Sequence, residues 1–285
     1  MFDPRGPSLG ELARQALSST RRGYDLLAPK FDWTPFRTPD WLLGAVAPHL
    51  GDAGSVRRAV DLCCGTGAAL PLLQRVSREV VVGVDFSLGM LREAQEVVAR
   101  SDAGPALHGS PRTGGIPLAS LAGALPPARP LRAAPAPLLG ERSRHSDVAT
   151  KPRIVFIQQD VLALGLAERF DLATIFGALG HLRPAVQARF LDQVRSCLSP
   201  GGTLAFVTAA LPPPWSPALW LAAGFDATMW LRNRLWRPPF YMYYLAWPLG
   251  RSLRLLREAG FTPEVRPLGT RRPLARLRLV LARRG

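Results

Sequence analysis

The sequence predicts an α/β fold organised around a doubly wound, mostly parallel β-sheet. The first observation is an apolar run that ends at Asp61 and continues into a turn of small residues over 63–67. The second is that strand-length apolar runs alternate with helical periodicities over 57–100 and again over 153–210. Because parallel neighbours need helical crossovers, this alternation favours a parallel sheet. A chain of 285 residues is long enough to bury a full core.

Residues 1–50 are expected to form a helical cap in front of the sheet. Ser8 and Glu11 have the spacing of a capping box at the start of a helix. The aromatic group Phe31, Trp33 and Phe36 follows, and it either packs on the core or forms a lid over the site. The chain start lacks a charged segment followed by an apolar run, so no signal peptide is expected.

Residues 57–100 follow the order strand, turn, helix, strand, turn, helix, and the second strand ends at Asp85. Residues 101–152 then break the pattern, because they are dense in Pro, Gly, Ala, Ser and Arg and show no sustained period. Structureless segments of this length are uncommon inside compact domains. We expect a disordered insertion here, with a partner-binding or lid element as the alternative.

The alternation resumes after residue 153. Three further strands are expected, at 154–157, 170–176 and 203–208. A helix over 184–198 and a turn over 199–202 precede the last of these. A helix over 251–260 ends at Gly260, and two final strands follow at 261–267 and 274–282. The last one alternates in part, as an antiparallel strand near a sheet edge does.

Residues 211–250 are rich in tryptophan and tyrosine, with arginines between them. The charge-free run over 201–225 is long enough to span a bilayer. The prolines at 212–214 interrupt it, however, so it predicts a buried strand, a loop and an apolar helix. We interpret 211–250 as an aromatic-rich substrate cap, and a plain hydrophobic cap is the alternative.

The formal net charge of +15 comes almost entirely from arginine, since Lys30 and Lys151 are the only lysines. A nucleic-acid surface would usually concentrate its charge, so a compositional bias of the whole chain is favoured. An anionic lipid surface is the next alternative. Cys63, Cys64 and Cys197 have neither a metal-binding spacing nor a disulfide pattern, so they are expected to be small apolar fillers in a reducing compartment.

The turn at 63–67 indicates a nucleotide-type cofactor. A strand brings such a turn to the sheet edge, and glycines let the backbone approach a ligand. Asp85 ends the next strand, where an acidic residue can bind a ribose. Nicotinamide cofactors are the close alternative, but their fingerprint needs three glycines around a pyrophosphate. Cys63 stands where the first of those glycines would be.

The chain resembles the class I S-adenosylmethionine-dependent methyltransferases in three motifs. These are Asp-Leu-Cys-Cys-Gly-Thr-Gly at 61–67, Gly-Val-Asp-Phe-Ser-x-Gly-Met-Leu at 83–91 and Leu-Ser-Pro-Gly-Gly-Thr-Leu at 198–204. The resemblance implies a Rossmann-like, seven-stranded, mostly parallel sheet with helices on both faces and the last strand antiparallel. It also implies S-adenosylmethionine as the cofactor and a methyltransferase domain over 51–100 and 153–285.

The resemblance further implies which residues contact the cofactor. The turn residues and Asp61 would line its methionine and ribose, Asp85 would bind the ribose hydroxyls, and the residues after the third and fourth strands would hold the adenine and flank the methyl group. The full set is Asp61, Cys63, Gly65, Gly67, Asp85, Phe86, Met90, Asp160, Val161, Phe176 and Gly177. No metal ligand is expected.

His181 follows the fourth strand and is the candidate catalytic residue. A histidine near neutral pH can act as a general base when the acceptor must lose a proton. The alternative is a histidine that caps or packs a helix.

Within the superfamily, the motifs look most like the ubiquinone/menaquinone-biosynthesis group of methyltransferases (methyltransferase type 11). The expected reaction is methyl transfer to a small acceptor that is apolar, lipid-like or aromatic, and residues 211–247 are a candidate for peripheral membrane contact. An RNA or other nucleic-acid methyltransferase and a non-catalytic S-adenosylmethionine-binding protein are the alternatives. A nucleic-acid partner is disfavoured, and the expected location is cytoplasmic, with membrane association left open.

Overall fold

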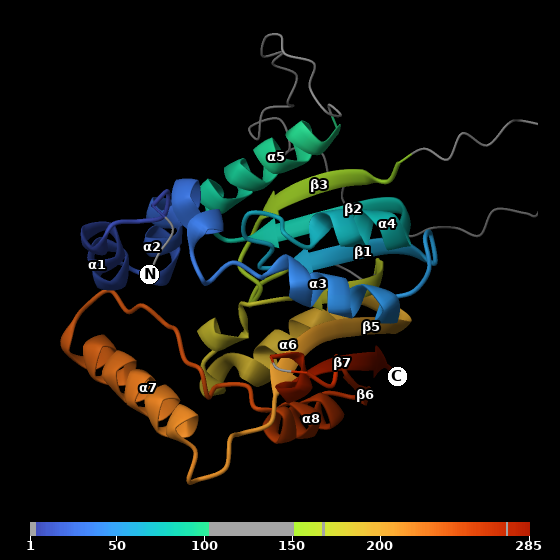
Figure 1. Cartoon of the computed structure of the whole chain (residues 1–285). Helices are drawn as coiled ribbons and strands as arrows, with labels where there is room; N and C mark the ends of the chain where they lie inside the picture. The colour runs from blue at the N-terminus through green and yellow to red at the C-terminus, as the bar shows by residue number, and fades with distance from the viewer. Residues whose placement is uncertain (1–3, 103–150, 167–168, 272) are drawn as a thin grey trace, which may run out of the picture.

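The computed structural model describes residues 4–102, 151–166, 169–271 and 273–285. Its centre, within these residues, is a seven-stranded sheet in the order β3-β2-β1-β4-β5-β7-β6 (Figure 1). The strands are β1 (Val56–Leu62), β2 (Ser77–Asp85), β3 (Arg153–Gln158), β4 (Phe170–Ile175), β5 (Leu198–Ala209), β6 (Phe261–Pro267) and β7 (Leu277–Arg284). Neighbours from β3 to β5 pair in parallel, and β7 is antiparallel to both β5 and β6. The predicted fold class is confirmed.

Helices cover both faces of this sheet (Figure 1). The helices are α1 (Leu9–Leu17), α2 (Thr20–Leu27), α3 (Asp40–Val46), α4 (Leu70–Val76), α5 (Leu88–Asp102), α6 (Gln187–Cys197), α7 (Pro217–Leu235) and α8 (Leu249–Glu258). Helices α3, α4 and α5 bury their apolar residues on one face, and α6 and α8 bury theirs on the other.

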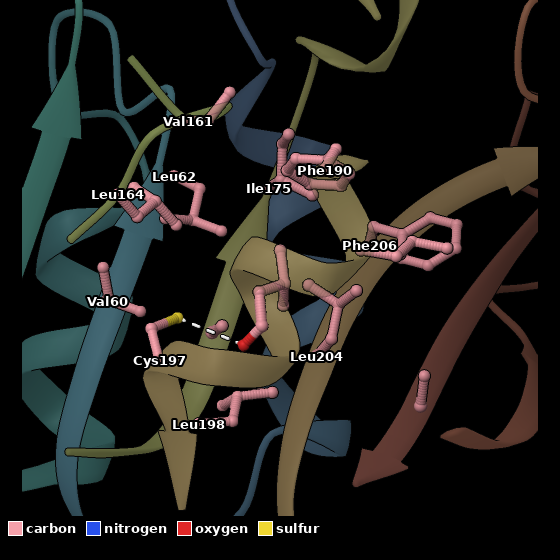
Figure 2. Packing of buried hydrophobic residues seen from close by; sticks show 14 of the residues in the cluster. Val60, Leu62, Val161, Leu164, Ile175, Phe190, Cys197, Leu198, Leu204 and Phe206 are labelled. Atoms are coloured by element: carbon pink, nitrogen blue, oxygen red, sulfur yellow. Dashed lines mark hydrogen bonds between the residues drawn. The ribbon is translucent and has the colours of Figure 1, made fainter. Parts of the chain in front are cut away.

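The strand sequences explain why both faces are buried. In β1, Ala59 packs under α3–α5 while Val60 and Leu62 pack under α6 and α8, and all three are fully buried. Successive side chains of a strand point to opposite faces, so a continuous apolar run fits a sheet that is covered on both sides. Figure 2 shows the α6 side of this core, where Phe190 lies near Ile175 of β4.

Several boundaries differ by a few residues from the sequence-based expectation, and two of the differences have a clear structural cause. The predicted turn over 199–202 lies inside β5, because Phe170 of β4 pairs with Leu198 and Leu172 pairs with Thr203. The four residues between those partners therefore form a bulge in the strand. The last strand begins at Leu277 rather than 274, since a short 3-10 helix precedes it, and it lies one position in from the sheet edge.

Other expectations agree with the structure where it describes the chain. Ser8 and Glu11 form the capping box of α1, with the Ser8 amide donating to Glu11 Oε2 at 2.7 Å. Strand β5, a loop and α7 follow one another as predicted for 201–225. No helix among the described residues is long and apolar enough to cross a membrane. The predicted insertion over 101–152 lies outside the described residues, apart from the end of α5 and residues 151–152.

Candidate active site

The strand order creates a crevice at the carboxyl ends of β1 and β4. From β1 the chain proceeds outward to β2 and β3, and it then returns to β4 on the other side of β1. In open α/β sheets, ligands bind at such a reversal, outside the carboxyl ends of the strands. A cavity of about 590 Å³ lies here, which is within the range of small-molecule sites.

Ten of the twelve residues singled out from the sequence line this cavity. They are Cys63, Gly65, Asp85, Phe86, Met90, Asp160, Val161, Phe176, Gly177 and His181. The other two, Asp61 and Gly67, lie outside the lining formed by the described residues. The sheet thus brings the ends of four strands together around one space.

The turn after β1 depends on left-handed backbone geometry. Gly65 and Gly67 have φ values of 54° and 85°, and Cys63 has 55°, which is uncommon for a residue with a side chain. A Cβ at position 67 would lie 2.9 Å from Leu70 Cδ1 and 3.2 Å from Ala94 Cβ. Gly67 is therefore required to pack the turn against α4 and α5.

Asp85 connects the turn that follows β1 to the turn that follows β2. Its Oδ2 accepts a hydrogen bond from the Gly65 amide at 2.9 Å, and its Oδ1 accepts one from the Ser87 amide at 2.8 Å. Burial raises the pKa of Asp85 to about 6, although these two amides oppose the shift. Each carboxylate oxygen has a second lone pair, so Asp85 can accept further hydrogen bonds from a ligand in the cavity.

Asp61 lies below the turn at the end of β1. Its Oδ1 accepts a hydrogen bond from the Thr174 hydroxyl of β4 at 2.6 Å, and the side chain is buried. Burial raises the pKa of Asp61 to about 7, with a smaller contribution from the nearby Asp85 carboxylate. Asp61 therefore links β1 to its neighbour β4 by a side-chain hydrogen bond, and its carboxyl group ionises only near neutral pH.

Replacing Asp61 with asparagine is expected to stabilise the protein above pH 7. The native carboxyl has a pKa of about 7 against an ordinary value of 3.8, so native stability falls as the pH rises through this window. Asparagine keeps an oxygen for Thr174 and has no charge to bury. A shift of this size corresponds to about 4 kcal/mol at most, and we expect a gain of about 1–4 kcal/mol. The measurement is urea unfolding from pH 4 to pH 8.5.

The gain from Asp61→Asn should disappear toward pH 4 and below, because the Asp61 carboxyl then becomes protonated in the unfolded state as well as in the native state. The matched control is Asp52→Asn, which removes a carboxylate from an exposed site. A stability difference that does not change with pH would contradict the assigned pKa.

The N-terminal helices close the site through two aspartates. Asp25 Oδ1 accepts hydrogen bonds from the Ser87 hydroxyl at 2.6 Å and the Gly89 amide at 3.0 Å, so it caps the start of α5. Asp32 Oδ1 accepts one from the Thr66 hydroxyl at 2.6 Å. Sequence reasoning did not single out either carboxylate for the site. Asp25 and Asp32 precede the first strand, so the rule that places acidic site residues at strand ends does not identify them.

His181 and Tyr24 form a half-buried, hydrogen-bonded pair in the cavity lining. His181 lies in the 3-10 helix Leu179–His181, and its Nδ1 contacts the Tyr241 carbonyl oxygen, which can only accept a hydrogen bond. Nδ1 therefore carries the proton, and Nε2 accepts from the Tyr24 hydroxyl at 2.7 Å. Burial lowers the pKa of His181, so the imidazole is neutral near pH 7.

The far wall of the cavity is aromatic and apolar. It is formed by the segment between α7 and α8, which contributes Pro239, Tyr241, Met242 and Tyr244. The Arg183 guanidinium lies 4.4 Å from the centre of the Tyr241 ring and packs on its face. This wall can hold an apolar or aromatic molecule beside the strand ends.

The cysteines have the environment of packing residues. Cys64 and Cys197 are buried, Cys63 is partly buried, and burial raises the pKa of all three thiols. In the core, the Cys197 thiol donates to the Val194 carbonyl at 3.2 Å (Figure 2). Within the described parts of the chain, no group of three or more metal-ligating side chains occurs.

The local charge distinguishes between the two cofactor classes. Asp61, Asp85 and Asp160 each raise the pKa of the Cys63 thiol, so the field at the turn is negative. A negative field disfavours the pyrophosphate of a nicotinamide cofactor and favours the sulfonium of S-adenosylmethionine. The carboxylates can also accept hydrogen bonds from ribose hydroxyls. The residues present therefore fit S-adenosylmethionine.

Comparison with solved structures supports the fold. An O-methyltransferase family protein from Burkholderia thailandensis aligns with a TM-score of 0.59 and 16% identity, covering 97% of this chain and 67% of that one. The protein DhpI in complex with SAH aligns with a TM-score of 0.56 and 15% identity, covering 98% and 99% of the two chains. No curated protein matches the chain significantly in sequence.

A family model described as a methyltransferase domain matches residues 39–264, which is well over half of the chain. The matched region begins just before α3 and ends within β6, so it includes the turns, strand ends and aromatic wall that form the cavity. The chain therefore belongs to the methyltransferase-domain family and is an S-adenosylmethionine-dependent methyltransferase.

Proposed function

We propose that this enzyme transfers a methyl group to a small acceptor that is apolar, lipid-like or aromatic. The observation that carries the proposal is the composition of the cavity at the strand ends. Asp85 and Asp160 line one part of it, and Tyr241, Met242 and Tyr244 line another. A polar cofactor end next to an apolar wall suits a methyl acceptor that is itself largely apolar.

The cofactor would bind where the sequence motifs meet. Asp85 would accept hydrogen bonds from the ribose hydroxyls, Phe86 and Met90 would pack on the adenine, and Asp160 with Val161 would bind its edge. Phe176 and Gly177 would flank the methionine part, near the turn formed by Cys63 and Gly65. Asp61 and Gly67 would support this turn from below. When bound, the cofactor supplies an electrophilic methyl group on a sulfonium, and the chain aligns the acceptor with it.

We propose that His181 and Tyr24 accept a proton when the acceptor is a hydroxyl. Tyr24 lines the cavity, and its hydroxyl donates to Nε2 of the neutral His181 imidazole. An acceptor hydroxyl that donates to the Tyr24 oxygen could therefore pass its proton through Tyr24 to Nε2. His181 would be the general base and Tyr24 the relay.

The proposal also assigns roles to the segments around the cavity. Residues 1–50 would act as a helical cap over the 51–100 and 153–285 methyltransferase domain, and 211–250 would be its substrate cap. The resemblance to the ubiquinone/menaquinone-biosynthesis group is compatible with an acceptor that combines a ring and an apolar tail. Such an acceptor would be met at the cytoplasmic face of a membrane, and peripheral contact would occur through 211–247.

Two measurements test the proposed function. Isothermal titration of the folded protein should give heat with S-adenosylmethionine and none with NAD, and absence of heat with the former would contradict it. Transfer of labelled methyl groups into a lipid extract and into RNA is then compared. Label in the lipid extract supports the proposal. Label only in RNA would establish the nucleic-acid alternative, and binding without transfer to either would favour a non-catalytic role.

A further inference from the structure

Helix α7 presents large apolar side chains to solvent along one side of its axis. None of its residues, all of which the structure describes, is buried. Trp215 before the helix is 82% exposed, and Leu221 and Trp230 within it are 76% and 60% exposed. We refer to the exposed residues Leu211, Trp215, Trp220, Leu221, Trp230, Leu231, Leu235 and Trp236 as the α7 apolar surface. Contiguous exposed apolar residues on this scale mark an interaction site.

Polar groups and one aromatic contact, between Phe225 and Tyr244, hold the helix in place, whereas Trp215, Leu221 and Trp230 stay exposed. Near its C-terminus, Arg232 Nη2 donates to the Ser18 carbonyl at 3.1 Å, and Trp236 Nε1 donates to the Leu17 carbonyl at 3.2 Å. Nearer its middle, the Asp226 carboxylate accepts from the amides of Tyr244 and Leu245 at 2.7 and 3.0 Å. Figure 1 shows α7 away from the sheet, on the same side of the molecule as α1 and α2.

The charges around this surface are positive. Arg14, Arg21 and Arg22 on α1 and α2 are exposed, as are Arg234 and Arg237 at the end of α7. Asp226 is the single acidic residue in the α7 sequence, and backbone amides already occupy it. Exposed indoles and leucines with flanking arginines are the composition of a peptide surface that lies in a membrane interface next to anionic headgroups.

A second copy of the chain is less suited than a lipid surface to cover the α7 apolar surface. Self-association through α7 would bring the same arginines of both copies together, and like charges in contact disfavour assembly. An anionic bilayer provides both an apolar layer for the indoles and negative headgroups for the arginines. The net charge of +15 adds long-range attraction to such a surface.

We propose that the α7 apolar surface docks on a phospholipid bilayer that carries anionic headgroups. The segments that anchor α7 also border the active-site cavity, because Ser19 and Arg21 line it from one side and Pro239 from another. Docking through α7 would thus bring an acceptor dissolved in the bilayer next to the cavity. This last step rests on the proposed function, whereas docking itself does not.

Vesicle flotation of the full chain tests the docking. One set of vesicles is phosphatidylcholine alone, and the other contains about a quarter phosphatidylglycerol. The variants are the triple substitution Trp215→Gln, Leu221→Gln, Trp230→Gln and the pair Arg234→Glu, Arg237→Glu. The matched controls are Trp41→Gln on α3, which is also exposed, and Arg254→Glu, Arg257→Glu on α8.

We expect wild-type protein and both controls to float with anionic vesicles, and tryptophan fluorescence to shift to the blue. The triple variant should bind at least tenfold more weakly. Loss of two arginines should weaken binding by about 25-fold, at roughly fivefold per arginine near an anionic surface. Equal binding of the triple variant and wild type, or absence of wild-type flotation together with a concentration-dependent dimer, would overturn the proposal.

Calorimetry with S-adenosylmethionine, done without vesicles on the same variants, keeps the two proposals separate. Flotation without cofactor binding would refute the proposed function and leave docking intact. Cofactor binding without flotation would refute docking, and with it the membrane contact through 211–247, and would leave the proposed methyl transfer intact. Unchanged cofactor binding in the triple variant also shows that its fold is intact.

Discussion

Replacing Asp85 with alanine is expected to weaken S-adenosylmethionine binding by about a hundredfold. Removal of the carboxylate leaves the amides of Gly65 and Ser87 without the acceptor that now holds both turns in place. It also removes the acceptor proposed for the ribose hydroxyls. Leaving buried donors unpaired costs about 1–3 kcal/mol, and a hundredfold change corresponds to about 2.7 kcal/mol. Titration calorimetry measures the change directly.

The pH dependence gives the Asp85 prediction a second readout. The pKa of Asp85 is raised to about 6, so its carboxyl is protonated at pH 5 and ionised at pH 7.5. Affinity for the cationic cofactor should therefore increase with pH through 6 in the wild type and much less in Asp85→Ala. Glu79→Ala is the matched control, since Glu79 lies near the amino end of the same strand and is exposed. An affinity that Asp85→Ala leaves unchanged would contradict the assigned role.

Removal of the Tyr24 hydroxyl or the His181 imidazole is expected to lower kcat by about a hundredfold for a hydroxyl acceptor. General base catalysis contributes about 10²–10⁴-fold, and both groups belong to one proton path. Tyr24→Phe keeps the ring that stacks on Phe240, so packing is preserved. His181→Gln removes the base itself. The KM for S-adenosylmethionine should change little in either variant.

A pH–rate profile separates this role from a structural one. Burial lowers the pKa of His181 and keeps the imidazole neutral near pH 7 and above, so wild-type kcat should be constant there. It should fall as the pH drops through the lowered pKa, because the protonated imidazole cannot accept a proton. This acidic limb should be absent in His181→Gln. Tyr241→Phe is the control on the same wall, and a Tyr24→Phe enzyme with wild-type kcat would rule out the relay.

The predictions from sequence were most successful where the signal is local. The apolar runs before Asp61 and Asp85 become β1 and β2, and the turn between β1 and α4 forms where small residues allow it. Asp160 and Phe176, which come just after β3 and β4, also line the cavity as predicted, since the carboxyl ends of parallel strands meet at one edge of the sheet. Boundaries were less certain, because the bulge within β5 depends on its pairing with β4.

The sequence by itself determined the order of strands, turns and helices and the acidic residues at the strand ends, because apolar periodicity and turn chemistry act over a few residues. The tertiary structure alone decided the rest. Tyr24 meets His181 across 157 positions and Asp25 meets Ser87 across 62, and neither pairing leaves a local pattern. It also decided that Asp61 and Gly67 lie outside the cavity lining formed by the described residues, and that the tryptophans of α7 face solvent. The burial of a side chain and its hydrogen-bond partners depend on packing between segments far apart in the chain, and no short stretch of sequence contains that information.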